Sequence, residues 1–319
     1  IVLAYVMQGA IKTMERFQMP KGLAVSITFV IFMGFFLSLL FFVIPRVWRQ
    51  LQSLFQNIPS MVERTRDLLG ELPVNYPELV SEQQVTSWIE LLNSESAELG
   101  QWLLSFSLSQ LPLLVAVAVY IMLVPLLVFF ILKDQRQILA WCSSYLPSEK
   151  PLLDRIGREM DEQMANYIRG KVIEIIIVGG ASFVFFQLMG LEYAALLGFL
   201  VGLSVIVPYV GFVAVTFPVL IIAYLQFGWG SEFITILIGY SIIQGIDGFF
   251  IVPLLFSEAV NLHPIAIITA VLVFGAWWGV WGVFFAIPLA TLIKAIMSAW
   301  PQTGHPIQGN TAVPALEKV

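Results

Sequence analysis

The sequence is short of charge. Of its 319 residues only 12% are Asp, Glu, Lys or Arg, whereas 59% are hydrophobic. Soluble globular domains carry about 25% charged residues, so this composition excludes an ordinary soluble domain. Several apolar runs approach or exceed the roughly 20 residues that a helix needs to cross a bilayer. We therefore predict an all-α fold: a polytopic integral membrane helical bundle, with the lipid bilayer as its main partner.

Cysteine and histidine are also scarce. Cys142 is the only cysteine, which excludes a disulfide framework and a thiolate metal cluster. The two histidines, His263 and His305, do not have metal-ligand spacing. The sequence contains no P-loop and no catalytic constellation, so we expect no enzyme, no cofactor and no metal. The net charge of −5 without a basic tract argues against a nucleic-acid partner.

The first part of the chain alternates between membrane and water-exposed character. Residues 1–10 are apolar but too short to span, and we expect them to be the tail of a truncated membrane helix. Residues 11–45 should form a loop and a first span, since Gly22–Ile44 carries no charge. Residues 46–110 mix charges with apolar residues at three- and four-residue intervals, which predicts a small domain of short amphipathic helices. The expected breaks are Pro59, Pro73 and Pro77.

Residues 111–171 combine a second span with an amphipathic helix. The span covers Leu111–Leu132, with Pro125 as the expected site of a kink. After it, apolar residues recur at four-residue steps, as is typical of an amphipathic helix on the membrane or on the bundle. They are Leu152, Ile156, Met160, Met164 and Ile168.

Basic residues predict the orientation, because they concentrate in cytoplasmic loops. Lys12, Arg16 and Lys21 precede the first span, and a second basic group follows the second span. Both loops should therefore be cytoplasmic, and residues 46–110 should be extracytoplasmic. The second group comprises Lys133, Arg136, Lys150, Arg155, Arg158, Arg169 and Lys171.

Residues 172–300 have the pattern of a transport core. A span at 172–189 is followed by an apolar stretch, 194–227, that "VPYVG" interrupts, and a span at 232–256 is followed by the stretch 264–297, which "GAWWGVWG" interrupts. The interrupted pieces are short for full spans, so they are either re-entrant hairpins or tight pairs of true helices. The two span-plus-hairpin units run in opposite directions, the arrangement of inverted repeats in transporters. A polar tail, 301–319, closes the chain.

Asp247 is the first candidate for a functional residue. It is the only charge within Gly239–Phe256. A carboxylate at bilayer depth costs about 2.5–3.5 kcal/mol, so such residues face a cavity or a partner and mark transport paths. Gln244 lies on the same helical face and can donate a hydrogen bond. We expect Asp247 to relay a proton or cation, or to accept hydroxyls of a polar solute; the alternative is a structural carboxylate paired within the bundle.

Three further places are candidates for the substrate or ion pathway. Glu174 lies near Lys171, which favours a structural ion pair, although Glu174 and Asp247 could instead form a coupled acidic pair. Pro208, Tyr209 and Gly211 belong to a helix break, where carbonyls could bind a cation. His263 could titrate near neutral pH, or serve only as a structural residue before a proline.

Two glycine pairs have the spacing that permits close helix contact. They are Gly198 with Gly202 and Gly275 with Gly279.

Four stretches resemble the autoinducer-2 exporter family of bacterial inner-membrane proteins. They are "YIRGKVIEIIIVGGASF", "GLSVIVPYVG", "IIQGIDGFFIVPLLFSEAVNLHP" and "WGVWGVFFAIPLATLIKA". The resemblance covers residue 1 to about 300, and Gln244, Asp247 and Pro253 match the family's Gln-x-x-acid pattern with a following proline. It implies a multi-pass transporter of the bacterial inner (cytoplasmic) membrane and, as in some members, a homo-oligomer with five copies.

Together these features predict a secondary transporter of a small polar solute that works by alternating access. Within the family that the sequence resembles, the assigned substrates differ: autoinducer-2 for some members, and sodium or lithium exchanged for protons for others. The open alternatives are therefore an exporter or permease, a sodium or lithium/proton antiporter, and a non-transporting envelope scaffold that recruits partners through residues 46–110.

Overall fold

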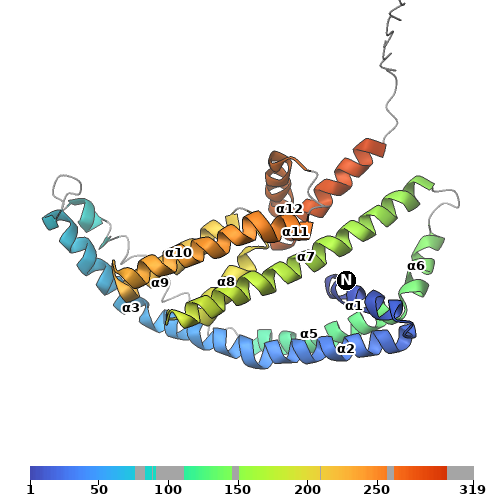
Figure 1. Ribbon diagram of the computed structural model, residues 1–319, viewed down its shortest axis with the longest axis horizontal. Coiled ribbons are helices and arrows are strands. Elements are labelled where there is room, and N and C mark those ends of the chain that lie inside the picture. The colour runs from blue at the N-terminus through green and yellow to red at the C-terminus, as the bar shows by residue number, and fades with distance from the viewer. Residues whose placement is uncertain are drawn as a thin grey trace, which may run out of the picture.

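The computed structural model describes residues 1–75, 83–87, 89–90, 111–145, 151–208, 210–256 and 262–299 (Figure 1). Every regular element within these ranges is a helix, which confirms the predicted all-α class. The helices form two neighbouring groups that share one long helix.

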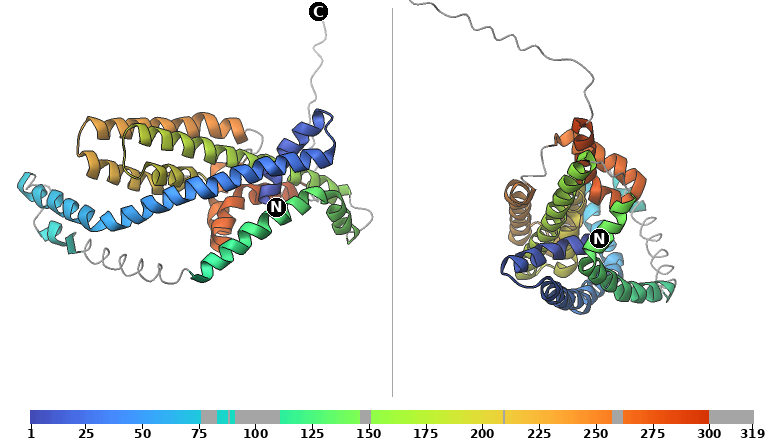
Figure 2. Two further views of the ribbon diagram at one scale, coloured as in Figure 1. Left: turned by 90° about the horizontal axis from the view of Figure 1, so that it is seen from below. Right: turned by 90° about the vertical axis from the view of Figure 1, so that its right-hand side faces the viewer.

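The first group contains the N-terminal helices. The element α1 (Val2–Arg16) packs against α2 (Lys21–Ser38) and α5 (Leu111–Lys133), and α6 (Gln135–Ser144) follows α5 directly. α1, α2 and α5 lie side by side (Figures 1 and 2). Their shared core is apolar and is built from Ala4, Met7, Ile11, Ala24, Val25, Val128 and Leu132.

One long helix connects this group to the rest of the molecule. α2 continues through a π-helical turn, η1 (Leu39–Val43), into α3 (Ile44–Asn75) without a loop. The break expected at Pro59 is absent: α3 passes through this residue. Proline removes only one hydrogen bond of the helix, and α3 packs against the core on both sides of it, through Leu51 and Leu54 before and Met61 after. The break expected at Pro73 is absent as well, because α3 continues through this residue to Asn75, and Pro77 lies outside the described residues.

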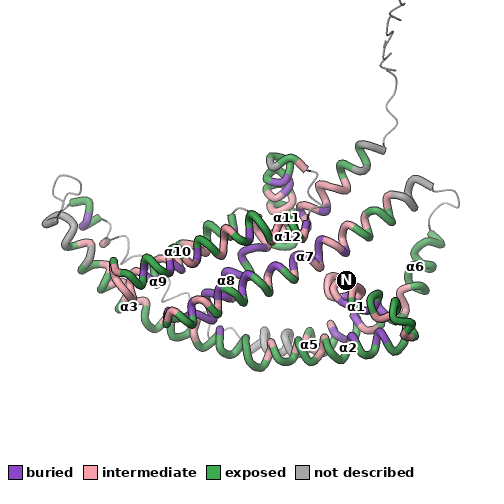
Figure 3. The backbone as a smooth tube through the Cα atoms, in the orientation of Figure 1, coloured by how far each residue is buried: buried purple, intermediate pink, exposed green. Residues whose placement is uncertain are grey.

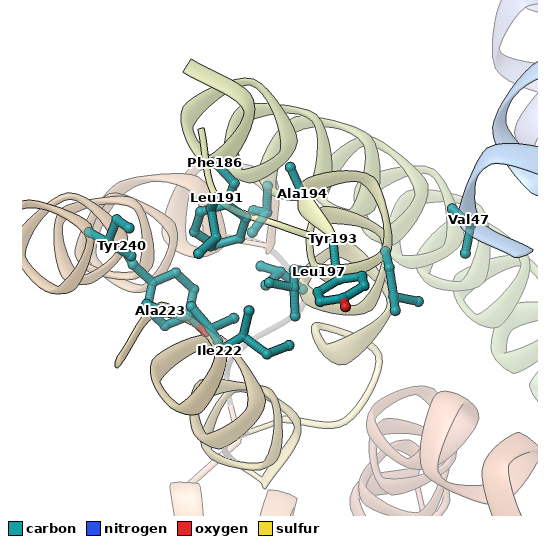
Figure 4. Packing of buried hydrophobic residues seen from close by; sticks show 14 of the residues in the cluster. Val47, Phe186, Leu191, Tyr193, Ala194, Leu197, Ile222, Ala223 and Tyr240 are labelled. Atoms are coloured by element: carbon teal, nitrogen blue, oxygen red, sulfur yellow. The ribbon is translucent and has the colours of Figure 1, made fainter. Parts of the chain in front are cut away.

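The second group is the helical core. The helix α7 (Pro151–Leu188) packs closely along α8 (Ala194–Ser204), and α9 (Val210–Phe227) and α10 (Ser231–Ile246) complete the bundle. Figure 4 shows the side chains of Phe186, Leu197, Ile222 and Tyr240 converging between these helices. The predicted amphipathic helix and the span after it are thus one continuous helix, α7.

The last elements contain two departures from a regular α-helix. A π-helical turn, η2 (Asp247–Ile251), joins α10 to α11 (Val252–Phe256). α12 (Pro264–Ala299) reverses direction at Gly279, whose φ is 59° and ψ −138°. A Cβ atom on Gly282 would lie only 1.8 Å from the carbonyl oxygen of Phe274, so the two arms fold back on each other. The interruptions that the sequence predicts thus fall between α8 and α9 and at Gly279.

Five described helical segments are long and apolar enough to cross a membrane: Lys21–Asp67, Ile156–Leu188, Val210–Phe227, Ser231–Phe256 and Ile265–Lys294. Large apolar side chains face outward along them, and Figure 3 shows exposed residues covering the outer faces of the helices. Such a surface is unstable in water and suits contact with lipid. The protein is therefore an all-α membrane protein with several spans.

Candidate functional site

A buried ion pair lies in the middle of α7. The Nζ atom of Lys171 is 2.8 Å from Oε2 of Glu174, one helical turn further along. Glu174 is 2% exposed and Lys171 5%. Burying both charges requires partners, because each loses its hydration. The pair is held between α8, which packs along α7, and α11, whose Phe256 ring lies 5.1 Å from the Lys171 ammonium.

Asp247 brings a second carboxylate to this part of the bundle. It is 9% exposed and begins the π-helical turn η2, which packs against α7. Asp247 interacts electrostatically with both Lys171 and Glu174. Its Oδ1 atom accepts no hydrogen bond from the described residues. With both acids ionised the cluster carries two negative charges and one positive charge. We call Lys171, Glu174 and Asp247 the charged cluster.

The break between α8 and α9 joins the cluster through a backbone carbonyl. Lys171 Nζ donates a hydrogen bond to the oxygen of Val205, at 2.8 Å, directly after α8 ends. A cation is favoured at a helix C-terminus, where carbonyl groups lack helical partners. The carbonyl of Val205 precedes the predicted break, and cation binding by the carbonyls of residues 208–211 stays a prediction.

The other residues of the break differ in position. Pro208 lies in the turn and is partly buried, and Tyr209 falls outside the described residues. Gly211 is buried in the first turn of α9, and a Cβ atom there would lie 1.8 Å from the carbonyl oxygen of Ser204. Only glycine permits this approach of α9 to the end of α8.

Gln244 starts a row of hydrogen bonds that leads away from Asp247. Its Nε2 atom donates to the Tyr240 hydroxyl at 2.9 Å, and this hydroxyl lies 3.2 Å from Oγ1 of Thr216 on α9. Because Thr216 Oγ1 donates to the carbonyl oxygen of Phe212, the Tyr240 hydroxyl is the donor to Thr216. The row ties α10 to α9 across an otherwise apolar interior.

Two predicted pathway residues lie outside this cluster. Pro253 is exposed on α11. His263 is exposed before α12, where its Nδ1 atom accepts a hydrogen bond from the backbone N–H of Ile265 at 3.3 Å. This contact is that of a helix N-cap, so His263 has a structural task at this position.

Of the two glycine pairs, Gly198 and Gly202 lie at close backbone contacts with α7. A Cβ atom on Gly202 would lie 2.9 Å from the Cα of Gly179, and one on Gly198 would lie 2.7 Å from the Cα of Phe183, both on α7. A Cβ atom on Gly275 would lie 2.9 Å from Val283 in the opposite arm of α12, and Gly279 makes the reversal itself.

Three participants were not identified as site residues from the sequence: Lys171, Tyr240 and Thr216. The spacing of Lys171 and Glu174, i and i+3, is a signal that two side chains share a helical face. No pattern in the sequence pairs Tyr240 with Thr216, because they belong to different helices.

Comparison with known proteins places these features in a family. The family model described as AI-2E family transporter matches residues 1–302. The chain belongs to the AI-2E transporter family. It is 45% identical to "Putative permease PerM" of Escherichia coli (strain K12) over 301 residues, which is 94% of this chain and 85% of that protein. It is also 25% identical to "Putative transport protein YueF" of Bacillus subtilis (strain 168), over 92% of this chain and 80% of that protein.

Membership agrees with the resemblance found in the four sequence stretches. It makes this chain a transporter-family protein with several membrane helices.

Proposed function

We propose that the protein is a secondary transporter of a small polar solute in the bacterial inner membrane, and that Asp247 binds the solute or a coupling cation. Autoinducer-2 is the first solute to test, because the family is named for it. Transport would proceed by alternating access, with the charged cluster exposed to one side of the membrane at a time.

The main support for this proposal is the charge of the buried cluster. The apolar bundle buries two carboxylates and one ammonium, which is paired with Glu174, and Asp247 Oδ1 has no hydrogen-bond donor among the described residues. Charged residues within membrane helices are rare and mark pathways for ions or polar substrates. One further positive charge, or a solute that donates hydroxyl hydrogens, would complete the cluster. The π-helical turn at Asp247 supports the same view, since such turns are frequent at functional sites.

The direct test is the variant Asp247→Asn in proteoliposomes with a pH gradient. We expect uptake of the transported solute to fall at least about tenfold, while the protein stays folded, because the amide carries no charge to bind a cation. The matched control is Glu232→Gln, an exposed acid at the start of the same helix. Wild-type flux in folded Asp247→Asn protein for autoinducer-2, sodium and lithium alike would refute the proposal.

A sodium or lithium/proton antiporter is the second candidate. With both acids ionised the cluster has a net negative charge, which favours a monovalent cation or proton as its ligand. Uptake of sodium or lithium that depends on the pH gradient, and the absence of autoinducer-2 flux, would favour this activity over signal export.

The proposal includes the organisation of the chain in the membrane. α8 with α9, and the two arms of α12, would be re-entrant hairpins or tight pairs of spans in two opposed units. Residues 46–110 would lie outside the cytoplasm, residues 133–171 inside, and the working form would be a homo-oligomer, with five copies as the resemblance implies. A non-transporting scaffold predicts instead that deleting residues 46–110 abolishes the phenotype while Asp247 variants leave it intact.

A further inference from the structure

Four helices of the N-terminal group meet at a basic pocket. The pocket has a volume of about 270 Å³ and lies where α1, α2, α5 and α6 come together. Its rim carries the cations Lys12 of α1, Lys21 of α2 and Arg136 of α6. Arg136 is far in the sequence from Lys12 and Lys21, so only the packing of α5 onto α1 and α2 brings it to them.

The floor of the pocket is apolar and firmly packed. Ile11, Val25 and Leu132 line it and are each at most 4% exposed. They belong to the core that joins α1, α2 and α5. The helices α1, α2 and α5 therefore each supply one residue of the pocket floor, and one of the three cations lies close in sequence to each of these floor residues. The pocket is a built feature of the fold, because the core fixes the positions from which the three cations extend.

The cations lack counter-ions in the part of the chain that the structure describes. None of Lys12, Lys21 and Arg136 forms a side-chain ion pair or hydrogen bond with another described residue. Glu15 also lines the pocket, yet it lies beyond ion-pair distance of all three. The four charges sum to plus two. Gln8 and Gln135 add amide groups that can donate hydrogen bonds to an anion.

The pocket lies at the ends of apolar helices. Lys21 begins α2, and the apolar helix α5 ends at Lys133, just before Arg136. In a membrane these helix ends are at the depth of the lipid headgroups, where basic pockets between helices bind anionic lipids.

We propose that this pocket binds the phosphate of an anionic phospholipid headgroup, with Lys12, Lys21 and Arg136 as its ligands. A glycerophosphate headgroup carries one negative charge and hydroxyls, which suits three cations, one carboxylate and two amides. The bound lipid would fasten α1 and α6 to α2 at the membrane surface. This binding site is independent of the proposed transport activity.

The test is equilibrium binding of dioctanoyl phosphatidylglycerol to the full chain in an uncharged detergent, followed by microscale thermophoresis. We expect Lys12→Gln/Arg136→Gln to weaken binding by about 30-fold, because each cation near an anionic lipid contributes about 1 kcal/mol and 1.4 kcal/mol is tenfold in affinity. Dioctanoyl phosphatidylcholine should bind weakly to both proteins.

The matched control is Arg16→Gln/Lys133→Gln. These exposed cations lie on α1 and α5 near the same membrane surface but do not line the pocket. The control, and the conservative variant Lys12→Arg/Arg136→Lys, should stay within about threefold of wild type, because both keep the charge of the pocket. Size-exclusion elution checks folding of each variant.

Three results would overturn the proposal. The first is equal weakening by the control pair, which would indicate diffuse surface charge. The second is phosphatidylcholine binding as tight as phosphatidylglycerol binding. The third is displacement of the lipid by inorganic phosphate at the lipid's own concentration, which would indicate a site for free anions.

Discussion

Lys171 and Glu174 form an ion pair of 2.8 Å inside the helical core, and both side chains are more than nine-tenths buried. The ammonium also holds the carbonyl oxygen of Val205 at the end of α8. The pair therefore links the middle of α7 to the break between α8 and α9, beside Asp247.

Replacing Lys171 should destabilise the protein strongly. Lys171→Met leaves Glu174 buried without a counter-ion, and breaking a buried pair on one side costs about 3–5 kcal/mol. We expect a clear fall in the thermal unfolding midpoint in detergent, measured by tryptophan fluorescence. Lys133→Met removes an exposed lysine from the end of α5 and should leave the midpoint unchanged.

The double variant Lys171→Met/Glu174→Leu separates charge from shape. Replacing both partners by apolar residues should recover most of the stability that Lys171→Met loses, because no unpaired charge remains. A double variant as unstable as Lys171→Met would contradict the assignment of the loss to the unpaired carboxylate.

Glycine at position 211 should be required for the approach of α9 to α8. Gly211→Ala places a Cβ atom 1.8 Å from the backbone oxygen of Ser204, so one helix must move. We expect a loss of about 2 kcal/mol or more of unfolding free energy, within the range for overpacked sites, together with impaired transport.

Gly180→Ala provides the comparison on α7. A Cβ atom there meets open space, and alanine is favoured over glycine in a helix by about 1 kcal/mol. This variant should be as stable as wild type or more so. If both glycine variants behaved alike, close packing at Gly211 would not be the cause.

The Tyr240 hydroxyl should couple α10 to α9. Tyr240→Phe removes the group that accepts from Gln244 and donates to Thr216, and each such hydrogen bond contributes about 0.5–1.5 kcal/mol. We expect Tyr240→Phe and Thr216→Val to be non-additive in a double-mutant cycle of unfolding. Strictly additive losses would show that the two side chains stabilise the bundle independently.

Cys142 offers a test of the proposed orientation. It is exposed on α6, in the segment expected to face the cytoplasm, and is the only cysteine of the chain. In intact cells a membrane-impermeant maleimide should leave Cys142 unlabelled and should label it after lysis. In a Cys142→Ser background, Gln56→Cys on the exposed face of α3 should be labelled before lysis. Labelling of Cys142 before lysis, with labelling of Gln56→Cys only after lysis, would show that the chain has the opposite orientation.

The sequence alone was enough to predict the membrane class and several features of the core. Sparse charge and apolar runs follow directly from composition, and a lipid environment tolerates little else. The turn at "VPYVG" and the reversal near Gly279 were visible because proline and glycine interrupt helices locally. Asp247 was identifiable because a single charge in a long apolar stretch is costly.

Other features depend on tertiary contacts that no local sequence pattern reveals. The sequence predicted a break at Pro59, but packing of Leu51, Leu54 and Met61 on the core keeps α3 continuous. The stabilisation from burying these side chains outweighs the local tendency of proline to end a helix. The structural N-cap contact of His263 likewise required the position of the Ile265 backbone N–H.

What the sequence by itself determined is thus the membrane environment of this protein, the places where glycine and proline interrupt the apolar helices of the core, and the isolation of Asp247, since all three depend on residue types along a short stretch of chain. Only the tertiary structure decided which distant groups meet. It brought Asp247 and the carbonyl of Val205 to the Lys171–Glu174 pair, and it brought Arg136 to Lys12 and Lys21 around one pocket. The physical reason is that charges far apart in the chain interact only once helix packing has fixed the distance between them.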